Sequence, residues 1–157
     1  MPHPRTPLAL TILLTALVSG ACGDGDVPTA PELQVIEDTE FDSSLGIDLS
    51  TMEVTESGVY YEDVEDGEGD PVGDGDAVTV GYTGYLSDGT VFDDGTFTFT
   101  LGANEVIPGF EDGVTGMRPD GVRRMIIPPE LAYGTQSVGA IPGGSILIFD
   151  VELVAVP

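Results

Sequence analysis

The sequence predicts a small α+β domain of about five antiparallel strands and a single short helix. Runs rich in β-branched and aromatic residues recur between residues 58 and 156, and turn sequences rich in Gly and Asp stand between them. Only one stretch in this region carries apolar residues at helical spacing. Strands joined by short turns favour antiparallel pairing, so the helix is expected to pack against one sheet.

Five runs are the predicted strands, and their sequences suit a sheet that is half buried. They occupy residues 58–64, 77–86, 96–101, 122–127 and 145–156. In the last run apolar and polar residues alternate, because Phe149 and Val151 flank Asp150 and precede Glu152. The turn signals between the runs are "DGEGDPVGDGD", "SDGT", "DDGT" and "IPGG".

The predicted helix covers residues 108–116. Pro108 suits a first helical position, and two acidic residues in the first turn suit the positive end of the helix dipole. One apolar face is formed by Ile107, Phe110, Val114 and Met117. The pattern alone favours a core helix packed on a sheet, and it leaves open a pocket lined by Val106, Ile107 and Phe110.

The charge of the chain excludes several partners. Among 157 residues, 28 are Asp or Glu and only 4 are Lys or Arg. Such a negative field repels nucleic acid and anionic lipid headgroups, so neither is an expected partner.

The N-terminus resembles an export signal. Residues 1–21 contain one Arg, an apolar run from Leu8 to Val18 that is too short for a permanent membrane span, and then small residues. Ser19-Gly20-Ala21-Cys22 resembles a bacterial lipobox, which predicts lipidation of Cys22 and an extracytoplasmic, membrane-anchored lipoprotein. The alternative is an ordinary signal peptide followed by a stray cysteine.

Cleavage before Cys22 would leave a chain without His, Lys or Trp. Such a chain has no Ser-His-Asp or Cys-His machinery, no His-ligated zinc and no Schiff-base lysine. No metal and no cofactor is therefore predicted.

Residues 22–51 are acidic and lack a sustained period, which indicates a flexible tether, and within it residues 41–52 are expected to dock as an N-terminal arm. The folded domain is expected to cover residues 52–157.

Four segments of the domain resemble the FKBP-type peptidyl-prolyl cis/trans isomerases. They are "VTVGYTGYLSDGTVFDD", "FTFTLGANEVIPGFEDGVTGM", "PPELAYG" and "LIFDVELV", which appear in the family's order and with nearly its spacing. The resemblance implies an antiparallel sheet of five to six strands wrapped around one short helix. It also implies isomerisation of X-Pro bonds in exported polypeptides and a macrolide inhibitor as a ligand. The tether is too short and too polar for the long helical dimerisation arms of some members, so a monomer is expected.

The resemblance also implies which residues form the site. Phe110 would be the floor of an aromatic pocket, the Ile107 N–H and the Tyr133 hydroxyl would donate to substrate carbonyls, and Asp93 at the rim would bond the Tyr82 hydroxyl. The implied catalytic residues are Tyr82, Phe92, Asp93, Ile107 and Tyr133. The implied substrate-binding residues are Phe97, Val106, Phe110, Ile141 and Phe149.

The pattern alone leaves other interpretations of these residues open. The phenylalanines and Val106 suit a plain core, the two tyrosines suit half-buried positions, and Asp93-Asp94-Gly95 suits a turn. Asp66, Glu68 and Asp70 have calcium-loop spacing, but Pro71 stands at the position of the required Gly. Asp-Gly-Thr occurs twice, but an aspartic hydrolase requires the order Asp-Thr-Gly, so the sequence argues against that class of enzyme. The main rival is an FKBP-fold module that binds a peptide or partner with little turnover.

Overall fold

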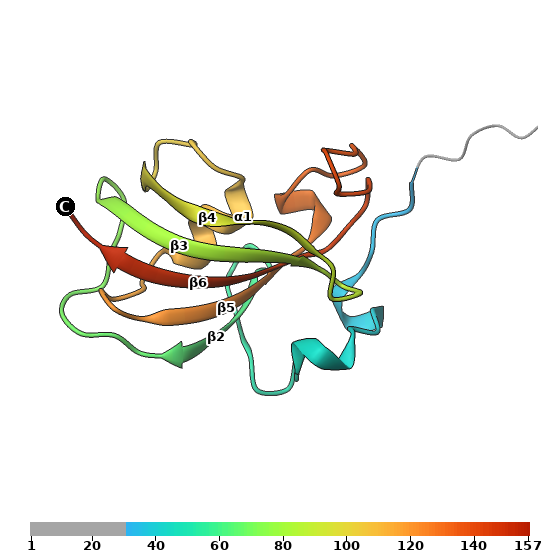
Figure 1. Ribbon diagram of the computed structural model, residues 1–157, viewed down its shortest axis with the longest axis horizontal. Helices are drawn as coiled ribbons and strands as arrows, with labels where there is room; N and C mark the ends of the chain where they lie inside the picture. Colours follow the sequence, from blue (N-terminus) through green and yellow to red (C-terminus); the bar gives the residue numbers. More distant parts are fainter. Residues whose placement is uncertain (1–30) are drawn as a thin grey trace, which may run out of the picture.

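One antiparallel sheet forms the framework of the protein (Figure 1). The computed structural model describes residues 31–157, so the predicted signal peptide and Cys22 lie outside the described residues. Within this part the strand order is β1-β2-β5-β6-β3-β4. The strands are β1 (Glu53–Val54), β2 (Tyr60–Glu65), β3 (Ala77–Leu86), β4 (Val91–Thr100), β5 (Val122–Ile127) and β6 (Leu147–Ala155). The predicted sheet of five to six strands around one helix is confirmed.

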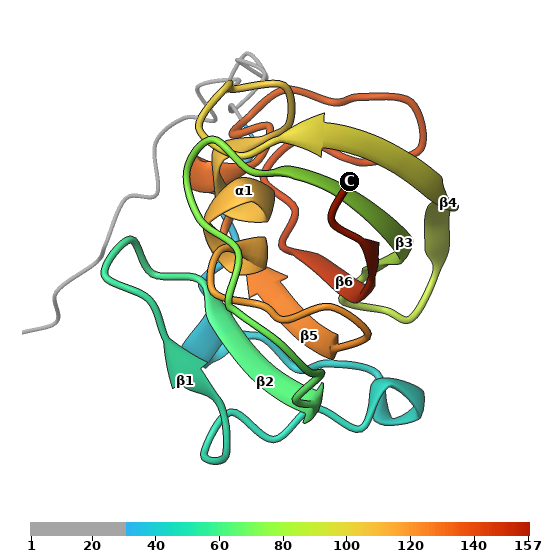
Figure 2. The ribbon, with the colours of Figure 1, turned by 90° about the vertical axis from the view of Figure 1, so that its left-hand side faces the viewer.

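Helix α1 (Pro108–Val114) lies against the inner side of the curved sheet (Figure 2). It ends two residues before the predicted end, because Thr115 has an extended ψ of 132° and Gly116 a φ of +83°. Two glycines let the helix approach the sheet closely. A Cβ at Gly109 would lie 2.2 Å from Ile127 Cγ2, and one at Gly113 would lie 2.4 Å from Met125 Sδ. The segment that leads into this helix is thereby held close to the sheet.

Strand β4 starts earlier than the sequence predicts. The residues 93–96 were expected to form a turn, and this expectation is wrong because they continue the pairing of β4 with β3. Gly95 lies opposite Tyr82, and Asp94 lies opposite Thr83. The turn lies instead at residues 87–90, where Leu86 N donates to Thr90 O over 2.9 Å. β4 is an edge strand, and its two acidic side chains, Asp93 and Asp94, are exposed.

Successive strand residues bury opposite faces of the sheet and contribute to two hydrophobic clusters. The inner cluster packs against α1 and includes Val78, Val80, Met125, Ile127, Leu147, Phe149, Val151 and Leu153. The outer cluster consists of Ile36, Leu45, Ile126, Ile146 and Ile148, with Phe41, Ile47, Leu49, Met52, Tyr60 and Tyr85 at its margin.

The outer cluster is completed by the segment that precedes the sheet. Ile36 and Leu45 are only 3% and 5% exposed, and Gln34 N donates to Gly144 O over 2.9 Å. The docked segment therefore begins earlier than the arm predicted at 41–52, because Gln34 and Ile36 already contact the domain. Apolar side chains at irregular spacing were enough to bury this segment, because the sheet offered an apolar outer face.

Two arginines fasten separate elements together. Arg123 is 6% exposed, forms a bidentate ion pair with Asp63 at 2.6 and 3.0 Å, and donates to Gly113 O and Thr115 O near the end of α1. Its guanidinium also lies 4.3 Å from the centre of the Tyr61 ring. These contacts join β2, β5 and α1.

Arg124 serves the other face of the sheet. It pairs with Asp150 at 2.6 and 2.7 Å and donates to Leu45 O, which holds the docked segment. The hydrogen bonds to Asp150 raise the pKa of Arg124 further above its usual range.

In the part of the chain that the structure describes, no helix has the length and apolar character needed to cross a bilayer.

Candidate active site

An aromatic pocket lies between the inner face of the sheet, the start of α1 and the segment after β5. Its volume is about 230 Å³. The lining residues are Tyr82, Phe92, Asp93, Phe97, Glu105, Val106, Ile107, Phe110, Tyr133 and Phe149. Hollows of similar volume occur elsewhere on the described surface, but this one has six aromatic rings and converging polar groups. Those features, and not its size, single it out as the candidate site.

Phe110 forms the floor of the pocket. It is 3% exposed, and its ring meets that of Phe149 edge to face at 5.1 Å. The rings of Tyr82 and Phe97 lie 6.2 and 5.8 Å from that of Phe110. Edge-to-face contacts fix the rings relative to one another. The floor is thus a preformed apolar surface and not a loose cluster of side chains.

A β-bulge places Phe92 in the wall. Gly84 pairs with Asp93 and Tyr85 pairs with Val91, so Phe92 is the extra residue of β4. A Cβ at Gly84 would lie 2.5 Å from Phe92 Cζ and 3.0 Å from Phe149 Cε1. The Phe92 ring therefore occupies space that any other residue at position 84 would fill. Sequence reasoning missed Gly84, although the glycine between Thr83 and Tyr85 in a strand was a signal.

Tyr82 holds Asp93 at the rim. The Tyr82 hydroxyl donates to Asp93 Oδ2 over 2.7 Å, and Asp94 N donates to Asp93 Oδ1 over 3.1 Å. The pKa of Tyr82 is raised to about 12. Burial is the largest cause, and the hydrogen bond to Asp93 and the nearby carboxylate charges raise the pKa further. The hydroxyl is therefore protonated at any physiological pH and remains a donor to Asp93.

Two further donors at the pocket meet no acceptor in the part of the chain that the structure describes. Ile107 precedes α1 with an extended ψ of 144°, and its carbonyl accepts from Phe110 N at 3.0 Å. Its own N–H donates no hydrogen bond within residues 31–157. Tyr133 follows the 3-10 turn Pro129–Leu131 and is 37% exposed, and in the same residues no acceptor meets its hydroxyl. Both groups are available to a bound carbonyl.

Ile141 is the one predicted site residue that does not line the pocket. Its backbone pairs with Val138 through two hydrogen bonds of 2.9 Å, which tighten the loop, and its side chain is 7% exposed within the inner cluster. Ile141 therefore supports the site as core. Conversely, Glu105 lines the pocket and was not predicted. Its place directly before the apolar Val106 and Ile107 was the available signal.

The pocket has no arrangement suited to a metal. Among residues 31–157, no three or more Asp, Glu, His or Cys side chains are grouped to hold a metal ion. Asp93 and Glu105, the two carboxylates at the rim, each accept a hydrogen bond from the protein. The site offers shape, apolar surface and hydrogen-bond donors.

Comparison with known proteins identifies the family. Residues 69–154, more than half of the chain, match the family described as FKBP-type peptidyl-prolyl cis-trans isomerase. The chain is 43% identical over 118 residues to FK506-binding protein 4 of Mycosarcoma maydis, covering 70% of this chain and 32% of that protein. It is 46% identical over 102 residues to FK506-binding protein 3 of Candida albicans, covering 62% of this chain and 24% of that protein. The chain thus spans about a third or less of the length of these relatives.

Solved structures show the same fold. FkpA from Escherichia coli aligns with a TM-score of 0.63 at 37% identity, covering 73% of this chain and 55% of that one. AtFKBP13 aligns with a TM-score of 0.62 at 34% identity, covering 68% of this chain and 98% of that one. The prediction of this enzyme family is confirmed, and the chain belongs to the FKBP-type peptidyl-prolyl cis-trans isomerases.

Proposed function

We propose that the aromatic pocket accelerates the cis–trans isomerisation of X-Pro bonds in polypeptides. The observation that carries this proposal is the combination of a rigid apolar floor with two donors that meet no acceptor among residues 31–157, the Ile107 N–H and the Tyr133 hydroxyl. A proline ring fits an apolar floor of this kind, and the donors suit the carbonyl groups on either side of it.

The reaction needs no titrating side chain. The isomerisation barrier is about 18–20 kcal/mol because twisting the peptide bond removes amide resonance. Water stabilises the planar, more polar amide better than the twisted one, so transfer into an apolar pocket favours the transition state. Each reduction of about 1.4 kcal/mol in the barrier speeds the step about tenfold. Hydrogen bonds that improve as the bond twists add to this effect.

Asp93 contributes through its charge. The planar amide carries more negative charge on its carbonyl oxygen than the twisted amide does, so a carboxylate near that oxygen disfavours the planar ground state. Tyr82 holds this carboxylate in place over 2.7 Å. Asp93 and Tyr82 therefore act together at the rim, while Phe97, Phe110 and Phe149 hold the proline ring.

The test is the cis-to-trans rate of a short Xaa-Pro-Phe peptide, with the chain from residue 23 onward as catalyst. The parent is expected to accelerate the exchange, and a Tyr133→Phe, Asp93→Leu double variant with an unchanged circular dichroism spectrum is expected to lose most of that acceleration. Peptide binding by a folded parent without acceleration would contradict the proposal and would favour the rival function of a binding module.

The proposed clients are exported proteins, and the proposed location is a membrane anchored through Cys22 on the extracytoplasmic side. The support is sequence alone, namely the apolar run and the small residues before Cys22. A Cys22→Ala variant is expected to move from the membrane fraction to the soluble exported fraction. Unchanged membrane association of that variant would contradict the anchor.

A macrolide is a second proposed ligand of the pocket, and the support is that the fungal relatives are FK506-binding proteins. It should compete with the peptide substrate, because both need the Phe110 floor.

We also propose a monomer. Sedimentation at two protein concentrations tests this, and a mass that rises with concentration would contradict it.

A further inference from the structure

The rim of the aromatic pocket carries negative charge. Asp93 and Glu105 both line the pocket, and Asp94 is near enough for its charge to contribute to the raised pKa of Tyr82. All three carboxylates are exposed. A polypeptide that places its proline on the floor must therefore bring its neighbouring residues past this rim.

No cation of the described chain neutralises this rim. Residues 31–157 contain 26 carboxylates and three arginines, and no lysine. The arginines are engaged elsewhere: Arg118 donates to Gly69 O, while Arg123 and Arg124 pair with Asp63 and Asp150. The negative potential at the pocket is thus unopposed by any described side chain.

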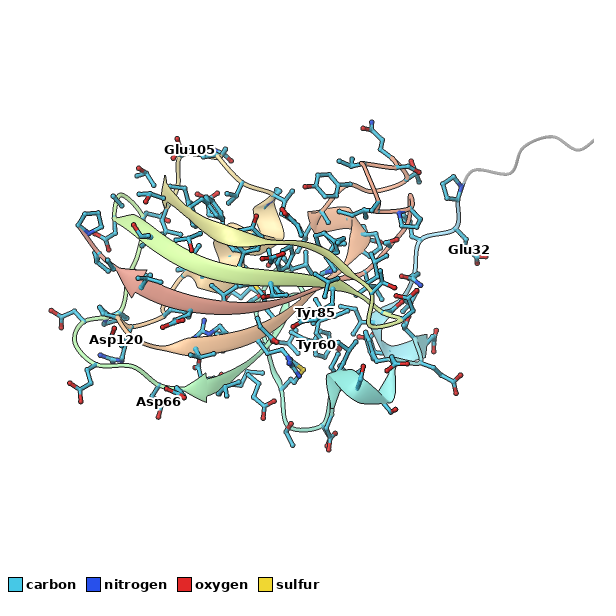
Figure 3. The ribbon with its side chains drawn as sticks, viewed as in Figure 1. Glu32, Tyr60, Asp66, Tyr85, Glu105 and Asp120 are labelled. Carbon is cyan, nitrogen blue, oxygen red and sulfur yellow. The ribbon has the colours of Figure 1, made fainter. Side chains whose placement is uncertain are left out.

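Glu105 is held in position, unlike an ordinary surface glutamate. Its Oε2 accepts from Thr100 N over 2.8 Å, which fastens the loop after β4. Glu111 fastens the same loop by accepting from Gly102 N. Figure 3 shows Glu105 at the loop beyond the end of β4. A fixed carboxylate loses little side-chain entropy when it pairs with a cation, and entropy loss is a main reason why exposed ion pairs are weak.

We propose that the pocket selects X-Pro segments that carry Lys or Arg beside the proline and discriminates against those that carry Asp or Glu. Glu105 is the specificity-determining residue, and Asp93 and Asp94 add to the field. This preference rests on the isomerase function proposed above. A basic side chain next to the proline reaches the rim while the proline ring occupies the floor, whereas an acidic one is repelled.

The test compares kcat/KM for two matched peptide series, with Lys, Gln or Glu placed directly before the proline or directly after it. In at least one series, the Lys peptide is expected to exceed the Glu peptide by roughly fivefold at low ionic strength. The ratio should shrink in about 0.5 M salt, because the Debye length there is below about 5 Å. Glu105→Gln should lower the Lys-to-Glu ratio. The matched control is Asp66→Asn, which removes the same charge from a loop well away from Glu105 (Figure 3).

The outcomes separate this inference from the proposed function. Acceleration of the Gln peptides with equal rates for Lys and Glu would overturn the preference and leave the isomerase function standing. An equal effect of Asp66→Asn and Glu105→Gln would also overturn it, because net charge and not the rim would then be responsible. If no peptide is accelerated, the isomerase function is wrong. The binding affinities of labelled Lys and Glu peptides then test the preference by itself, and equal affinities would overturn it as well.

Discussion

The Tyr82 hydroxyl donates to Asp93 Oδ2 over 2.7 Å, from a central strand to the edge strand beside it. Because burial and this bond raise the pKa of Tyr82 to about 12, the bond persists across the physiological range. Folded Tyr82 retains its proton between pH 10 and about 12, whereas the unfolded side chain loses it. The raised pKa of Tyr82 therefore contributes fully to the free energy of unfolding below pH 10. This contribution is lost as the pH rises from 10 to about 12.

Tyr82→Phe should remove the highest-pH step from the tyrosinate absorbance titration. It should also cost about 0.5–1.5 kcal/mol of unfolding free energy near pH 7, through loss of one hydrogen bond. Ultraviolet titration and urea unfolding measure the two effects. A variant whose titration still shows that highest step would mean that another tyrosine is the most strongly perturbed one.

Gly84→Ala should reduce isomerase activity by displacing Phe92. The new Cβ would meet Phe92 Cζ at 2.5 Å, and overpacking of this kind costs about 1–3 kcal/mol. The matched control is Gly81→Ala in the same strand, where a Cβ would lie 3.7 Å from Val154 Cγ2, an ordinary contact. Peptide kinetics and urea unfolding of both variants check this. Equal effects of the two changes would show that Phe92 does not depend on Gly84.

Arg123→Met should destabilise the protein by about 2–4 kcal/mol, because Asp63 and the carbonyls of Gly113 and Thr115 lose their partner. Arg118→Met removes the same charge from an exposed residue with one described contact, so it should cost less than about 1 kcal/mol. Chemical unfolding measures both. Similar costs for the two variants would contradict the role of Arg123 in joining α1 to the sheet.

Leu45→Ala should cost about 2–4 kcal/mol, since Leu45 is buried against the outer face of the sheet. Peptide kinetics should remain near those of the parent because the pocket lies on the inner face. A loss of less than about 0.5 kcal/mol would show that the docked segment behaves as a tether in solution.

The alternation of apolar residues allowed most of the sheet to be predicted. Strands β3 and β5 match the predicted ranges 77–86 and 122–127. Buried residues alternate with less buried ones along the start of β3, and all residues of β5 are buried or half-buried. The start of β4 was missed because Asp and Gly at 93–95 are typical of turns, and only pairing with β3 overrides that preference.

The candidate site depended on relationships that lie outside any one segment. Motif positions indicated Tyr82, Asp93, Ile107 and Phe110, and the structure brings them to one pocket. Single-segment patterns carry no information on the bulge at Phe92, the turning of Ile141 into the core or the fastening of Glu105 to Thr100. The bulge is set by the pairing of β4 with β3. The other two depend on hydrogen bonds within short loops, from Val138 to Ile141 and from Thr100 to Glu105, which apolar periodicity does not specify.

Catalysis by the aromatic pocket is tested most directly by an NMR exchange spectrum of a Leu-Pro peptide with a small amount of the chain from residue 23 onward. We expect exchange cross-peaks between the cis and trans forms, together with a shift of the Ile107 amide resonance on addition of peptide. Absence of cross-peaks with a protein whose spectrum shows that it is folded would contradict the claim that this pocket catalyses isomerisation.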